Sequence, residues 1–186
     1  MYKVLIAFLL LTIAFAAADE ATTNALVSIN NPKENQMLAP GQQLILQYTI
    51  NGFPPNNGAS HVDPAPNYPS SLEVYLKWTK NDQNIQLRAA GGLVTAAKAG
   101  GNSRMYNRPW KLPNCHFFRR YMPSEWSFSL VFDPQYPASK TTTANNMSNS
   151  AHTPLITLGP KQSQIIIPIS IKFNATAMTD SRHSGC

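Results

Sequence analysis

The sequence predicts an all-β protein, a β-sandwich of about seven to nine strands. Three observations support this fold class. Apolar and polar residues alternate with a period of two in several segments, prolines are scattered along the chain and oppose long helices, and no stretch after Ala18 keeps helical spacing. Because a period of two places alternate side chains on opposite faces of a strand, several such segments predict two packed sheets.

Four segments carry the clearest alternation, and four more carry it weakly. The clear ones are residues 44–50, 72–79, 126–132 and 165–173, and the weaker ones are residues 26–30, 85–89, 116–121 and 155–158. Pro168 falls inside the last clear segment. Because proline lacks the N–H that a ladder bond needs, we expect Pro168 on an edge strand or at a bulge.

Long connections separate these strands. They span residues 51–71, which are proline-rich, residues 91–114, which are rich in glycine and basic residues, and residues 133–153, which are rich in Ser, Thr and Asn. Connections of this length in a compact domain are typical of functional or disordered loops.

The chain opens with a segment typical of a secretory signal. Lys3 precedes an apolar run from Val4 to Ala18 that ends in small residues, and this run is shorter than the about 20 residues that span a bilayer. We therefore predict a signal peptide at residues 1–18, one sandwich domain at 19–175 and a polar C-terminal tail at 176–186. No hydrophobic terminal tail follows, so we expect a secreted, extracellular protein without a membrane span or lipid anchor.

If the chain is secreted, its sequons and its two cysteines predict glycosylation and a disulfide. Asn146 and Asn174 each begin an N-x-S/T sequon, which predicts N-glycosylation. Cys115 and Cys186 are the two cysteines, and an oxidising compartment favours a bridge between them that closes a loop of about 70 residues. The alternative is that Cys186 stays free or pairs with another molecule.

Catalytic patterns are missing from the sequence. It has no G-x-S-x-G elbow and only four histidines. Two of its acidic residues, such as Asp63, Glu73, Glu125 and Asp133, could lie close enough for a paired-carboxylate site, but the sequence identifies no such pair. His61 and Asp63 lack the further ligands that a metal site requires. The predicted first residue after cleavage is Asp19, whereas a copper polysaccharide oxygenase would begin with histidine. We expect no enzymatic activity, cofactor or metal.

The most informative stretch is residues 98–120, which is basic, aromatic and free of acidic residues. Guanidinium and ammonium groups suit carboxylates, sulfates and phosphates, and flat rings can stack on sugars. The candidate ligand-binding residues are Arg104, Tyr106, Arg108, Trp110, Lys111 and Arg119. The alternative is a solubilising basic loop with its aromatic side chains packed beneath it. Trp78 and Trp126 are in phase with core positions, so Trp110 is the tryptophan to test as a contact.

The residues from Ile29 to Ile50 follow an order that is known from one protein family. They contain a strand, then Asn31-Pro32, a spacer, Pro40-Gly41 and a second strand with Tyr48 near its end. This order resembles the fungal secreted yeast cell-wall-synthesis family, whose members are Ser/Thr-rich and often GPI-anchored. The resemblance implies an immunoglobulin- or fibronectin-like fold and a link to β-glucan assembly or the cell wall. It identifies no functional residue of this chain.

Together these patterns predict a secreted, non-catalytic sandwich that is associated with the fungal cell wall as a structural or glycan-binding protein. Its expected partner is a cell-wall polysaccharide or a secreted or surface protein, and secretion disfavours nucleic acid. A protein–protein interaction module, such as an effector or inhibitor, is the alternative, and an unrecognised enzyme is the third hypothesis.

Overall fold

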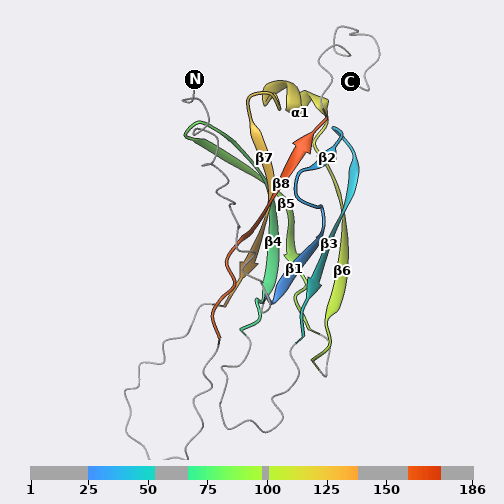
Figure 1. Cartoon of the computed structure of the whole chain (residues 1–186), viewed down its shortest axis with the longest axis vertical. Helices are drawn as coiled ribbons and strands as arrows, with labels where there is room; N and C mark the ends of the chain where they lie inside the picture. Colours follow the sequence, from blue (N-terminus) through green and yellow to red (C-terminus); the bar gives the residue numbers. More distant parts are fainter. Residues whose placement is uncertain (1–24, 53–66, 98–100, 138–158, 173–186) are drawn as a thin grey trace, which may run out of the picture.

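The strands form two sheets that pack face to face (Figure 1). This computed structural model describes residues 25–52, 67–97, 101–137 and 159–172. One sheet contains β1 (Val27–Asn31), β3 (Gln43–Ile50) and β6 (Arg104–Lys111) in that order. The other contains, in order, β2 (Gln36–Leu38), β8 (Ile165–Ile171), β7 (Ser127–Gln135), β4 (Ser71–Lys80) and β5 (Gln83–Leu93). The predicted all-β sandwich is confirmed.

The strand order is of the immunoglobulin type. The order β1-β3-β6 facing β8-β7-β4-β5 corresponds to strands A-B-E facing G-F-C-C′ of that fold. All pairs are antiparallel except β2 with β8, which is parallel. Trp78 lies on β4, the counterpart of strand C, which carries the buried tryptophan of immunoglobulin domains.

The core lies between the sheets and is built from the predicted alternation. Every second residue of β3, β4 and β7 is buried: Leu44, Leu46, Tyr48, Ile50, Leu72, Val74, Leu76, Trp78, Phe128, Leu130 and Phe132. The intervening residues of β3 and β4 face outward and are half-buried or exposed. The four clear strand predictions are therefore confirmed, although Trp126 and Lys172 lie one residue outside β7 and β8, and Phe173 lies outside the described residues.

The turn at Pro40-Gly41 connects β2 and β3. The Gln42 N–H donates to the Ala39 carbonyl oxygen over 3.0 Å, and Gly41 has φ +71°. Proline followed by a residue with positive φ is the sequence signature of a type II turn. The predicted turn is confirmed.

One predicted strand, residues 116–121, is a helix instead. Helix α1 (Cys115–Arg120) begins after Asn114, whose Oδ1 accepts a hydrogen bond from the Phe117 N–H over 3.4 Å. The helix caps one end of the sandwich with a fully buried Phe118. Six residues are too few for periodicity to separate a helix from a strand, and the capping asparagine was the better signal.

The predicted connection 91–114 is also wrong, because it contains the end of β5 and all of β6. The short strand β2 was not predicted either. Both β6 and β5 lie at sheet edges, where incomplete burial of the inward face leaves a weak hydrophobic pattern. The predicted segment 155–158 and the central parts of the other two long connections lie outside the described residues.

Pro168 lies on an interior strand, since β8 has β2 on one side and β7 on the other. The expectation of an edge strand is therefore wrong. The Pro168 carbonyl oxygen accepts from the Asn35 N–H over 2.7 Å, so this residue's peptide groups face β2. No ladder bond with β7 is lost, because the Pro168 nitrogen faces away from β7, and none with β2, because β2 pairs only from Ile169 onward. The register between β7 and β8 shows no bulge at this residue.

A bulge in β5 is held by an ion pair. Arg88 Nη2 lies 2.6 Å from Glu73 Oε2, and the Gly92 N–H donates to Glu73 Oε1 over 2.9 Å. The Arg88 side chain crosses Gly91, where a Cβ would overlap the guanidinium group. A larger residue at position 91 would displace this flexible guanidinium group from its place beside Glu73.

The predicted signal peptide, C-terminal tail and sequons at Asn146 and Asn174 all lie outside the described residues. They stay predictions. Within residues 25–52, 67–97, 101–137 and 159–172, no helix has both the length and the apolar character needed to cross a membrane.

Candidate ligand-binding surface

Four predicted ligand-binding residues project from one face of β6. The register pairs Arg104, Tyr106, Arg108 and Trp110 with Ile50, Tyr48, Leu46 and Leu44 of β3. Directly paired residues share a face of the sheet, so the four lie on the side that faces the core. Lys111 pairs with Gln43 and projects from the opposite face. We call the four residues the β6 row.

The position of β6 at a sheet edge keeps this row accessible. Arg104 and Arg108 are exposed, and Tyr106 and Trp110 are half-buried. The Leu112 N–H donates to the Gln42 carbonyl oxygen over 2.9 Å, so residues of even number in β6 direct their peptide groups toward β3. Pro109, of odd number, therefore directs its nitrogen toward the free edge, where no ladder bond is lost.

Tyr106 is held firmly by the sandwich. Its ring stacks on that of Tyr48, with centroids 5.4 Å apart, and its hydroxyl donates to the Ala96 carbonyl oxygen over 2.7 Å. The Arg104 guanidinium carbon lies 5.1 Å from the centroid of the Tyr106 ring. The tyrosine thus forms a fixed floor beneath Arg104.

Beneath the row, Tyr48 is almost fully buried and donates from its hydroxyl to the Val94 carbonyl oxygen over 2.9 Å. Burial raises the pKa of Tyr48 to about 12, and nearby Tyr106 adds to the increase. Arg108 has the opposite and smaller effect on the pKa of Tyr48, because its positive charge favours the phenolate form.

Arg119 is not part of the β6 row. It lies on α1, where His116, Arg119 and Arg120 form the exposed face of the helix. Their spacing of three and four residues puts them on one side, opposite the buried Phe118. Since α1 follows three residues after Lys111, the helix continues the basic surface from the end of β6 onto the end of the sandwich.

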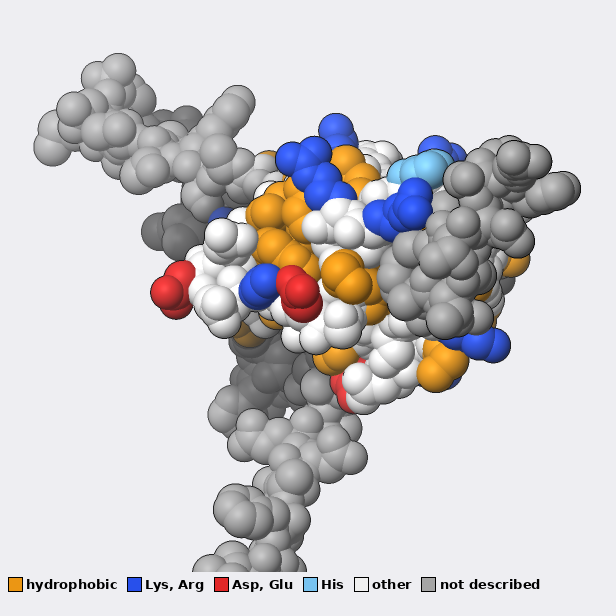
Figure 2. Space-filling model, turned by 90° about the horizontal axis from the view of Figure 1, so that it is seen from above, with side chains coloured by type: hydrophobic (Ala, Val, Ile, Leu, Met, Phe, Trp, Pro, Cys, Tyr) orange, Lys and Arg blue, Asp and Glu red, His pale blue; other side chains and the backbone are white. Residues whose placement is uncertain are grey.

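An aromatic cluster lies at the same end and was not predicted. The Trp78 ring meets Phe117 and Tyr121 at centroid distances of 4.9 and 5.0 Å, and Tyr121 meets Trp126 at 5.3 Å. Figure 2 shows hydrophobic side chains gathered on this end, with Lys and Arg side chains beside them. Recognising Asn114 as a helix N-cap would have predicted a helix at residues 115–120. That helix brings Phe117 against Trp78.

Two cations border this aromatic cluster. Lys80 Nζ lies 5.9 Å from the centroid of the Trp126 ring and pairs with Glu125 Oε2 at 2.5 Å. The Arg120 guanidinium carbon lies 5.6 Å from the centroid of the Tyr121 ring. The first interaction connects the end of β4 to the segment before β7. The second keeps a guanidinium group over an aromatic face at the surface.

Cys115, the first residue of α1, is buried and disulfide-bonded. Its predicted partner, Cys186, lies outside the described residues, so the pairing stays a prediction. A disulfide at this position ties the start of the helix that carries Arg119 and Arg120.

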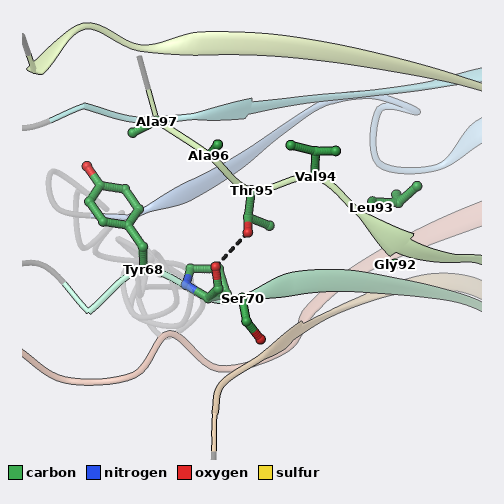
Figure 3. Close-up of a pocket in the computed structure, with 9 residues that line it drawn as sticks. Tyr68, Ser70, Gly92, Leu93, Val94, Thr95, Ala96 and Ala97 are labelled. Atoms are coloured by element: carbon green, nitrogen blue, oxygen red, sulfur yellow. Dashed lines mark hydrogen bonds between the residues drawn. The ribbon is translucent and has the colours of Figure 1, made fainter. Parts of the chain in front are cut away.

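The structure also contains an open hollow of about 470 Å³ (Figure 3). It lies between residues 68–70, which lead into β4, and residues 92–97 at the end of β5. The hydroxyls of Tyr68, Ser70 and Thr95 already donate to the carbonyl oxygens of Asn51, Gln135 and Pro69. With no charged side chain in its described lining, this hollow is a weaker binding candidate than the β6 row.

Acidic side chains are absent from the described lining of this hollow. Glu73 and Asp133 are directly paired across β4 and β7, but they lie on the outer face of the five-stranded sheet, with Glu73 bound to Arg88. Among the described residues, no three His, Cys, Asp or Glu side chains gather where they could hold a metal ion.

Comparison with known proteins adds no relative. The sequence matches no protein-family model and has no significant match among curated proteins.

Proposed function

We propose that this protein is a secreted, non-catalytic β-sandwich that binds a cell-wall polysaccharide along the β6 row and the adjoining face of α1. The supporting observation is the alternation on one face of β6, where exposed Arg104 and Arg108 stand beside half-buried Tyr106 and Trp110. Guanidinium groups donate to sugar hydroxyls or acidic substituents, and half-buried rings offer a fixed apolar floor for sugar faces. The resemblance of residues 29–50 to a cell-wall family supports the same partner.

Retention on insoluble polysaccharide tests this function. The purified secreted chain is mixed with insoluble β-glucan and with chitin, and the bound fraction is measured after sedimentation. We expect retention on at least one polymer and a loss of about tenfold in affinity for the double variant Arg108→Ala/Trp110→Ala, since it removes one charged contact and one aromatic contact. A protein that stays wholly in the supernatant with every wall polymer contradicts the proposal.

A matched control separates binding from folding. Lys77→Ala/Tyr75→Ala also removes one cation and one aromatic ring, but from the outward face of β4. We expect this variant to bind as the unchanged protein does. Thermal unfolding of both double variants identifies any loss of binding that comes from loss of the fold.

A second function, binding to another secreted or surface protein, is favoured by the outer face of the three-stranded sheet. Ile45 and Met105 are 52% and 56% exposed there, beside Pro109 and uncharged amides such as Gln47 and Asn107. Capture of one specific protein, abolished by Ile45→Lys and unaffected by Arg108→Ala/Trp110→Ala, would favour this function over polysaccharide binding.

Secretion is tested by N-terminal sequencing of the protein from culture medium. We expect Asp19 as the first residue and carbohydrate at Asn146. A chain retained inside the cell with Met1 in place would contradict both the location and the proposed partner.

A further inference from the structure

We infer that the ligand of this surface is a polyanionic glycan, an extended sugar chain that carries carboxylate, sulfate or phosphate groups. It lies along β6 and reaches α1. This inference rests on the proposed polysaccharide binding and names the chemical class of the polysaccharide.

The first argument is which atoms of the surface reach solvent. Arg104 and Arg108 are exposed, whereas Tyr106 and Trp110 are half-buried. The Tyr106 side chain is also held in place by its stack on Tyr48 and by its hydrogen bond to the Ala96 carbonyl oxygen. A ligand that approaches β6 therefore meets cations first and aromatic rings only as a floor. A neutral glucan surface would need the reverse order, with rings outermost.

The second argument is the segregation of charge between the sheets. Strands β1, β3 and β6 contain no acidic residue, whereas Glu73 and Asp133 lie on strands of the other sheet. Among the described residues, Arg104, Arg108, Lys111 and Arg120 have no carboxylate partner, while Glu73 and Glu125 are paired with Arg88 and Lys80. Positive charge on this side is thus available to an external anion.

The third argument is shape. Arg104 and Arg108 lie four residues apart on β6, about 13 Å along the strand, and Arg120 continues the positive charge on α1. None of them lines the described hollow between residues 68–70 and 92–97. Guanidinium groups bind carboxylate, sulfate and phosphate oxygens in pairs, so a line of them fits a chain with repeated anionic groups.

Affinity measurements with soluble polymers test the inference. The probes are polygalacturonate, dextran sulfate and neutral laminarin, each at low and high salt. We expect binding to the two anionic polymers, a marked fall with salt and weaker binding to laminarin. Comparison of polygalacturonate with dextran sulfate shows whether carboxylate or sulfate is the preferred group.

Two pairs of substitutions of equal charge locate the site. Arg104→Gln/Arg108→Gln removes two charges from the β6 row and should weaken polyanion binding about tenfold. Lys33→Gln/Lys172→Gln removes two charges beside β2 and β8 and should change it less than about twofold. Arg104→Lys/Arg108→Lys keeps the charge and should retain part of the affinity, which controls for misfolding of the glutamine variant.

The outcomes separate this inference from the proposed function. Salt-insensitive binding to laminarin, stronger than to either polyanion, overturns the inference and leaves polysaccharide binding intact. No binding to any of these polymers or to insoluble wall polysaccharide overturns both. Equal losses in the two glutamine variants, or binding to vesicles of anionic phospholipid without binding to polyanionic glycans, also overturns the inference.

Discussion

Tyr48 and Tyr106 stack with an interplanar angle of 18°, and their hydroxyls donate to carbonyl oxygens only two residues apart, those of Val94 and Ala96. One tyrosine lies on β3 and the other on the edge strand β6, whereas both acceptors follow β5 in the opposite sheet. The pair therefore joins the two sheets on the side of the molecule that carries the candidate ligand-binding surface.

The two hydroxyls should contribute unequally to stability. Tyr48→Phe removes a buried hydroxyl, breaks its part-buried hydrogen bond to the Val94 carbonyl oxygen and should cost about 1 to 2 kcal/mol. Tyr106→Phe leaves a more accessible acceptor and should cost about 1 kcal/mol or less. Urea unfolding of both variants measures the difference, and a larger cost for Tyr106→Phe would contradict the burial that distinguishes the two sites.

Stability should also fall in alkali because of Tyr48. Its pKa is raised to about 12 in the folded protein, chiefly by burial, against about 10 in the unfolded chain. The unfolded state therefore ionises first, and the contribution is intact below about pH 10 and lost as the pH rises toward 12. The loss is about 3 kcal/mol at most.

Urea unfolding between pH 8 and pH 11 measures this dependence, with Tyr48→Phe as the test variant and Tyr75→Phe, on the outward face of β4, as the control. The decline should become shallower in Tyr48→Phe and stay unchanged in Tyr75→Phe. Equal slopes in all three proteins would show that Tyr48 is not the group responsible.

Gly91 and Arg88 should be energetically coupled. Gly91→Ala places a methyl group where the Arg88 guanidinium lies and displaces it from Glu73, at a cost of about 1 kcal/mol or less because Arg88 is exposed. In an Arg88→Ala background the same substitution meets no side chain and should cost much less. A double-mutant cycle gives the coupling energy, and additive costs would contradict this account.

Helix α1 should depend on one buried ring. Phe118→Ala removes a fully buried side chain that packs on Phe128 and should cost about 3 to 5 kcal/mol. Phe117→Ala is the matched control, since Phe117 is only half-buried, and it should cost less. Asn114→Ala removes the N-cap and should cost about 1 kcal/mol. Denaturant midpoints of the three variants establish the order.

Sequence patterns predicted the central strands because one face of each is buried along its length while the other faces outward. In β3 and β4 every second residue is buried, so a period of two was sufficient. The same reasoning failed on β6, where the face toward the core carries Arg104 and Arg108 and therefore looks polar. Edge strands are partly uncovered, and their composition follows solvent exposure as much as secondary structure.

The sequence predicted the residues of the candidate site but not their arrangement. The basic and aromatic residues were found from composition, but only the strand geometry of β6 shows that Arg104, Tyr106, Arg108 and Trp110 share a face while Lys111 does not. The placement of Trp126 and Tyr121 beside Trp78 depends on contacts between β4, α1 and the segment before β7, which are distant in sequence. Local patterns carry no information about such contacts.

Pro109 has a consequence for how these molecules meet one another. Its nitrogen faces the free edge in the middle of an otherwise regular strand, so a second strand that aligned there would find a gap in the row of donors. Arg104, Arg108 and Lys111 add mutual repulsion between two such edges. The margin of the sheet is thereby protected against growth by strand addition, and recognition along it is left to side chains rather than to the backbone.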